Sequence, residues 1–234
     1  MGSDWSWTVT LPGGTVRPEA VERLLAVAGT LGLAPERPDG GCNGFDTSPG
    51  HEGEHVVLDR PGLVRGLATG ARSTTLWRGS DVSVLMVTKL GAWDTVTLHL
   101  DACYCRRTPD ARADPFRALH RLLTDLWVAL ADELGAVFGR VEDEWSLEQI
   151  WAELRDPLAF ATPPPPGAWP EWLSWSTYLD AGRYEALPPL PAELDARVRR
   201  TPGGAVIELS DDPAAVDPLR FARLHRVLAG ATRG

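Results

Sequence analysis

The stretch SDVSVLMVTKLGAWDTVTLHLDACYC (80–105) carries the clearest strand pattern of the chain and decides its fold class. Residues 82–87 form a β-branched run that is apolar on both faces, as a strand inside a sheet requires. Residues 95–105 alternate between apolar side chains and small or polar ones, which is typical of a strand with one buried face. Gly91 to Asp94 supplies a turn between the two segments. The stretch therefore predicts an antiparallel hairpin.

A long amphipathic helix follows the hairpin. Asp114 can cap free backbone N–H groups, and Pro115 fits the first helical position. An apolar stripe must pack on another element, and the apolar face of the hairpin is the nearest candidate. We therefore predict an α+β fold in which a mostly antiparallel sheet packs against this helix. The stripe recurs at intervals of three and four and comprises Phe116, Leu119, Leu122, Leu123, Leu126, Leu130, Leu134 and Val137.

The segments before the hairpin also alternate between strand and helix patterns. Residues 35–53 are the exception, because their glycine, proline and aspartate content predicts a loop that is too polar for the core. The strand patterns cover 5–11, 56–58 and 74–78, and the helix patterns cover 17–32 and 60–69.

The segments after the long helix predict further elements of the same domain. Four prolines at 163–166 favour an extended, stiff connector. We expect residues 1–234 to form a single α+β domain, in which this proline-rich joint could separate the main body from a C-terminal extension. The other elements are a helix over 146–154, an aromatic segment at 169–179 that re-enters the sheet or covers its edge, a short helix over 191–198, a strand at 205–209 and a last helix. Two starts are open for this last helix, Asp212-Pro213 and Asp217-Pro218, and the second is preferred.

The amino-acid composition limits the kinds of partner and the cellular compartment that we expect for this protein. The formal net charge of −9 and the single lysine, Lys89, argue against binding to nucleic acid, which requires clustered Lys and Arg. Three cysteines without framework spacing indicate a reducing compartment. Met1 to Leu11 lacks the basic and apolar regions of a secretion signal, and no apolar run approaches the roughly 20 residues of a membrane helix. We expect a soluble, cytoplasmic protein that does not bind membranes.

The polar side of the second hairpin segment raises one catalytic alternative. His99, Asp101, Cys103 and Cys105 would all point the same way on a continuous strand, where they could bind zinc or build a cysteine nucleophile. Side chains two residues apart on a strand are roughly 7 Å apart, so a tetrahedral site would need a second element. A metal- or cysteine-dependent hydrolase using His99, Asp101 and Cys103 is therefore one alternative, and a strand face with small packed residues is the other.

Acidic residues and tryptophans gather after the long helix. Large aromatic residues beside a charged patch are typical of protein interfaces, and a negative patch speeds the encounter with a basic partner. The ten tryptophans could equally cover the core or line the pocket of a small-molecule-binding regulatory domain. We expect no catalytic residue, metal or cofactor, and we predict a partner-binding surface formed by Glu142, Asp143, Glu144, Trp145, Glu148 and Trp151.

The order of segments resembles a known family. A hairpin, a long helix that ends in LGAVFGRVEDEW (134–145), a proline-rich joint, PEWLSWSTYLDA (170–181) and GGAVIELSDDPAAVD (203–217) together resemble the immunity-protein 52-like group of bacterial polymorphic toxin systems. The resemblance covers roughly residues 80–220 and rests on pattern, without a catalytic signature. It implies a small cytoplasmic α+β protein without enzymatic activity, which binds and neutralises a cognate toxin, often a nuclease. An acidic chain fits this function, since it can occupy the basic substrate cleft of a nuclease.

Overall fold

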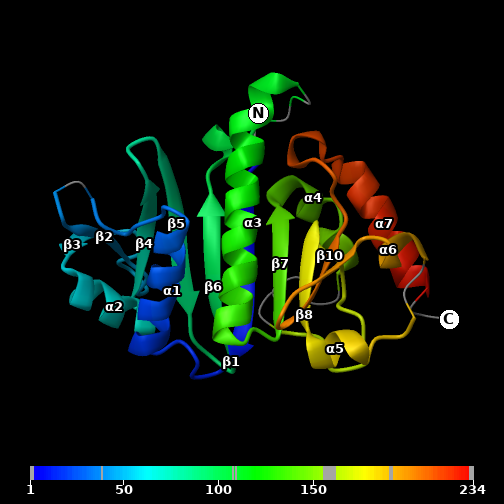
Figure 1. The fold of residues 1–234 in the computed structure, drawn as a ribbon, viewed down its shortest axis with the longest axis horizontal. Coiled ribbons are helices and arrows are strands. Elements are labelled where there is room, and N and C mark those ends of the chain that lie inside the picture. Colours follow the sequence, from blue (N-terminus) through cyan, green and yellow to red (C-terminus); the bar gives the residue numbers. More distant parts are fainter. Residues whose placement is uncertain are drawn as a thin grey trace.

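The protein is built on one ten-stranded sheet (Figure 1). From one edge to the other, the strand order is β3-β2-β4-β5-β6-β1-β7-β8-β10-β9, and every neighbouring pair is antiparallel. The predicted α+β fold with a mostly antiparallel sheet is therefore confirmed. The computed structural model describes residues 3–37, 39–106, 108, 110–154, 162–189 and 192–231.

The predicted hairpin forms, but its second strand is shorter than expected. Strand β5 (Val82–Lys89) pairs with β6 (Trp93–Leu100), as the alternation indicated, but Trp93 and Asp94 belong to the strand and not to the predicted turn. The predicted continuation of this strand to residue 105 is wrong, because a 3-10 helix covers Ala102–Tyr104. The carboxylate of Asp101 accepts a hydrogen bond from the backbone N–H of Cys103 and caps this turn. Consequently, residues 101–105 do not share the strand face of β6.

The long helix α3 (Asp114–Leu134) is confirmed, but it packs on different strands from those expected. It lies over β1 (Trp5–Pro12) and β7 (Phe138–Asp143), which are neighbours in the sheet (Figure 1). The Trp127 indole N–H donates to the carbonyl oxygen of Thr8 at 2.8 Å, and a side chain at Gly139 would collide with the Trp127 ring. The hairpin is therefore not the main support of the helix.

The N-terminal half supplies one edge of the sheet and two helices. The predicted loop at 35–53 contains a strand, β2, which is a correction to the sequence analysis. The sequence of β2, CNGFD, has little intrinsic preference for a strand. It forms one because β3 and β4 pair with it on both sides. The elements are α1 (Pro18–Thr30), β2 (Cys42–Asp46), β3 (His55–Leu58), α2 (Arg60–Ala68) and β4 (Arg72–Arg78).

The C-terminal half completes the other edge. The aromatic segment re-enters the sheet as β8, as predicted, whereas the expected helix over 146–154 is divided into α4 and a 3-10 turn at Trp151–Glu153. Pro191, the predicted start of the short helix over 191–198, falls outside the described residues. The helix itself covers only Ala192–Asp195, and Val198 begins a strand instead. The elements are α4 (Glu144–Glu148), β8 (Ser176–Asp180), α5 (Ala181–Glu185), α6 (Ala192–Asp195), β9 (Val198–Arg200), β10 (Gly204–Glu208) and α7 (Pro218–Ala231).

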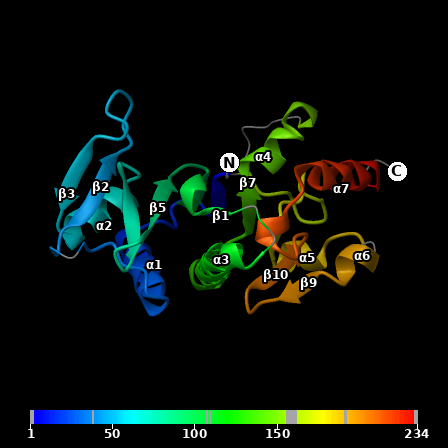
Figure 2. The ribbon, with the colours of Figure 1, turned by 90° about the horizontal axis from the view of Figure 1, so that it is seen from above.

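The two faces of the sheet are covered differently. Helices α1 and α3 lie on one side, whereas α4 and α7 lie on the other side, over the C-terminal part of the molecule (Figure 2). Trp5, Trp7 and Val9 of β1 are buried under α3, and each such side chain contributes roughly 1.5–3 kcal/mol or more to folding. The alternate residues Ser6 and Thr8 point to the opposite face and are only half-buried. Within the described part of the chain, none of the helices has the length and apolar character needed to cross a bilayer.

Candidate functional site

A groove opens on the sheet face opposite α3. Strands β5, β6 and β1 form its floor, α4 forms one wall, and its volume is about 440 Å³. We call the strand residues of this floor the open face: Ser6, Thr8, Val87, Lys89, Thr95, Thr97 and His99. The remaining lining residues are Asp4, Glu142, Asp143, Glu144 and Leu147.

Strand pairing sets the character of the open face. Thr8 of β1 lies opposite Thr97 of β6, and their hydroxyl oxygens are 3.1 Å apart. Ser6 lies opposite His99 in the same register. Because β-branched threonines are stiff and both strands lie inside the sheet, this floor is preformed. It presents methyl and hydroxyl groups, which can meet both apolar and polar partner side chains.

Two exposed carboxylates stand at one end of the groove. Asp4 precedes β1, and its Oδ1 accepts a hydrogen bond from the backbone N–H of Ala102 at 2.7 Å. Glu144 is the first residue of α4, and its backbone N–H donates to the carbonyl oxygen of Asp4 at 3.1 Å. This backbone bond holds the two acidic residues close together, and both side chains are exposed.

A lysine stands at the other end. Lys89 is the last residue of β5 and lies opposite Thr95, whereas His99 lies opposite Leu85 near the acidic end. Although His99 is open to the groove, the surrounding protein lowers the pKa of its imidazole, and the charge of Lys89 lowers it further. His99 is therefore neutral at pH 7 and can donate or accept a hydrogen bond.

Two of the predicted partner-binding residues are buried. Glu142 accepts hydrogen bonds from the Trp172 indole N–H at 2.6 Å and from the Ser174 hydroxyl at 2.7 Å. Asp143 accepts one from the Trp175 indole N–H at 2.7 Å, and it also caps α4 through the backbone N–H of Ser146. These carboxylates anchor the aromatic segment before β8, beneath the groove wall.

The other four predicted residues reach the surface in different places. Glu144 lines the groove. Glu148 is exposed, Trp145 is half-buried and Trp151 is 39% exposed, but none of these three lines the groove. Three of the predicted residues therefore line the groove, the two buried anchors Glu142 and Asp143 and the exposed Glu144, whereas the other three lie farther along the α4 segment.

Sequence reasoning missed the open face as a site. The sequence places Thr95 and Thr97 only on the polar side of a strand, His99 in the hydrolase alternative, and Thr8 in an alternating pattern. The available signal was that two strands, 5–11 and 95–100, both alternate hydroxyl side chains with apolar ones. Nothing in the sequence alone pairs these distant strands side by side.

The residues of the hydrolase alternative do not converge in the way that alternative required. His99 lies on β6, whereas the Asp101 carboxylate is occupied by the Cys103 backbone N–H at 2.7 Å. Asp101 raises the pKa of the exposed Cys103 thiol, and burial raises the pKa of Cys105 to about 12. Both thiols are therefore protonated at neutral pH and are weak nucleophiles. Among the described residues, no three His, Cys, Asp or Glu side chains form a cluster able to hold a metal ion.

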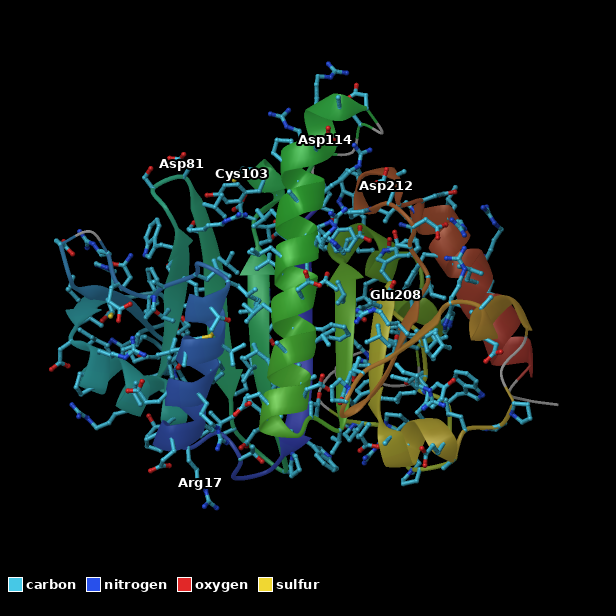
Figure 3. All side chains as sticks on the ribbon, viewed as in Figure 1. Arg17, Asp81, Cys103, Asp114, Glu208 and Asp212 are labelled. Atoms are coloured by element: carbon cyan, nitrogen blue, oxygen red, sulfur yellow. The ribbon has the colours of Figure 1, made fainter. Side chains whose placement is uncertain are left out.

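A second cavity, of about 650 Å³, lies beside α3. Arg117 of this cavity forms an ion pair with Asp212 at 2.8 Å, and Asp114 and Asp212 lie at the same end of α3 (Figure 3). Burial lowers the pKa of His120 to about 3, so this lining residue is neutral. Trp175 is the one tryptophan among the described lining residues, so the cavity is not the aromatic pocket that a small-molecule-binding domain predicts.

Comparison with known proteins gives a likeness of fold. No protein-family model matches the chain, and no curated protein matches it either. Among solved structures, the chain is similar to the Pseudomonas aeruginosa T6SS protein PA0821, with 13% sequence identity and a TM-score of 0.52. The match covers 97% of this chain and 73% of the P. aeruginosa protein. At this identity the likeness establishes a shared fold.

Proposed function

We propose that this chain is an immunity protein of a polymorphic toxin system, which binds and neutralises a cognate bacterial toxin in the cytoplasm. In this proposal it acts without enzymatic activity, by covering a functional surface of the toxin. The observation that carries the proposal is the open face: a groove of about 440 Å³ with strands β5, β6 and β1 as its floor.

The open face has the properties of a binding surface. Its strands are held by ladder bonds on both sides, so little conformational entropy is lost when a partner docks. Its hydroxyl groups offer hydrogen bonds, and the carboxylates of Asp4 and Glu144 give one end a negative charge. Complementary charge increases the rate at which a partner of opposite charge is captured.

The structural comparison also supports a role in a bacterial toxin or secretion system. The similar P. aeruginosa protein is named as a T6SS protein, and the match covers 97% of this chain. We carry this context to the chain as part of the proposal. The segment order that resembles the immunity-protein 52-like group points to the same class of system.

Co-expression with the toxin encoded next to its gene tests the proposal. We expect the chain to restore growth and to co-purify with the toxin. The variant Thr97→Arg places a long charged side chain in the floor of the groove and should abolish both effects. Thr30→Arg, at the exposed end of α1, is the matched control and should leave both intact.

Two results would contradict the proposal. If the chain binds no product of a neighbouring gene and gives no protection, the immunity function is wrong. If Thr97→Arg folds normally by circular dichroism and still protects as well as Thr30→Arg, the toxin binds elsewhere and the open face is not the binding surface.

A further inference from the structure

The groove carries opposite charges at its two ends. Asp4 and Glu144 stand at the end where β1 begins, beside the pair Ser6 and His99. Lys89 stands at the end where β5 finishes, opposite Thr95. Since β1 and β6 are antiparallel, the strand register places these two ends on opposite sides of the Thr8–Thr97 pair.

The charges at both ends are available to a partner. Within the described part of the chain, Asp4, Glu144 and Lys89 form no ion pair with another residue. Arg140, the nearby cation of β7, is buried, stacks over the Trp172 ring at 3.6 Å and interacts electrostatically with the carboxylates of Glu142 and Glu171. The groove therefore has a negatively charged end and a positively charged end, separated along the direction of its strands.

The spacing of the two ends fits a short extended segment. Thr95 and His99 are four residues apart on one strand, which corresponds to about 13 Å at roughly 3.3 Å per residue. An extended partner segment with the same rise would carry its first and last side chains over the two ends. Its central residues would lie over Thr8 and Thr97, where methyl groups and hydroxyls are offered.

From this arrangement we infer that the groove receives an extended segment of the toxin that carries a basic side chain at the Asp4 and Glu144 end and an acidic side chain at the Lys89 end. The inference rests on the proposed function and specifies the chemistry of the partner. The acidic end holds two carboxylates, so it favours an arginine or lysine. Lys89 can pair with a carboxylate about 13 Å away along the segment, at roughly 3.3 Å per residue.

Affinity measurements on the purified complex with the co-purified toxin test this inference. The variants Asp4→Asn and Glu144→Gln remove charge and keep side-chain size, and the double variant should weaken binding at least tenfold. Lys89→Glu should weaken binding similarly, and all three changes should reduce the dependence of the dissociation constant on salt. Glu19→Gln is the matched control, since Glu19 is also an exposed acid in the first turn of a helix, and it should change neither quantity.

The outcomes separate this inference from the proposed function. Unchanged affinity and salt dependence in the charge variants, with loss of binding in Thr97→Arg, would overturn the charged segment and keep the open face as the toxin site. Self-association that Thr97→Arg abolishes would also overturn it, because a second copy of the chain would then cover the groove. A chain that binds no toxin at all removes both the inference and the function on which it rests.

Discussion

The two faces of strand β1 differ in the burial and the chemistry of their side chains. On one face, Trp5, Trp7 and Val9 are at most 1% exposed and pack beneath α3. On the other face, Ser6 and Thr8 are half-buried and contribute to the groove. Because the two sets alternate along one strand, neighbouring residues serve the packed core and the floor of the groove. The open face can therefore change its chemistry without a large loss of core packing.

The largest expected loss of stability comes from a substitution on the face of β1 that α3 covers. Trp7→Ala removes a buried indole and its hydrogen bond to the Thr124 hydroxyl, which is 3.0 Å long. The free energy of unfolding should fall by about 3–5 kcal/mol. Thr8→Ala, one residue along the strand, should cost about 1 kcal/mol or less, since it loses a half-buried hydroxyl contact. Urea unfolding of both variants checks the contrast, and equal losses would contradict it.

A smaller effect on stability should distinguish the buried carboxylate of Asp143 from that of its exposed neighbour Glu144. Asp143→Ala removes the cap of α4 and the acceptor of the Trp175 indole N–H, and should cost about 2–3 kcal/mol. Glu144→Ala, at the exposed groove wall, should change stability by no more than about 0.5 kcal/mol. Thermal unfolding monitored by tryptophan fluorescence measures both. Asp143→Asn keeps one acceptor oxygen and is expected to lie between them.

The smallest effect concerns the ion pair that joins α3 to the segment before α7. Arg117 lowers the pKa of Asp212 below its ordinary value of 3.8, so the folded state favours the ionised carboxylate. This contribution is present above the ordinary pKa and is lost as pH falls through the lowered pKa. The pair is partly exposed, so we expect it to be worth about 1 kcal/mol or less. Unfolding measured from pH 6 down to pH 2 should show a shallower acid loss in Asp212→Asn, and an identical pH profile would contradict the assignment.

Sequence periodicity was sufficient for the elements with strong local patterns. The alternation over residues 95–105 and the apolar stripe from Phe116 to Val137 predicted a hairpin and a helix, and the structure confirms both with shifted bounds, Trp93–Leu100 for the strand and Asp114–Leu134 for the helix. Strand β2 was missed because CNGFD has neither alternation nor β-branched residues, and its pairing with β3 and β4 is non-local. The support of α3 was missed for a similar reason, since β1 is distant in sequence.

The candidate site was predictable in part. The acidic segment after β7 was recognised, and Glu144 does line the groove. The sequence could not show that Glu142 and Asp143 are buried, because this depends on Trp172 and Trp175, which join them from thirty residues or more further along. The hydroxyl floor could not be assembled either, since its register requires knowing that β1 lies beside β6.

The central position of β1 has a consequence for synthesis on the ribosome. Trp5 pairs with Leu100 on one side and with Asp143 on the other, so both partner strands are made long after β1. Until they emerge, the tryptophan-bearing strand has two open edges, and neither half of the sheet can close around it alone. Such long-range pairing slows folding, typically to milliseconds or seconds. The nascent chain therefore cannot complete its core until β7 has emerged, and this delay lengthens its exposure to aggregation and to chaperones.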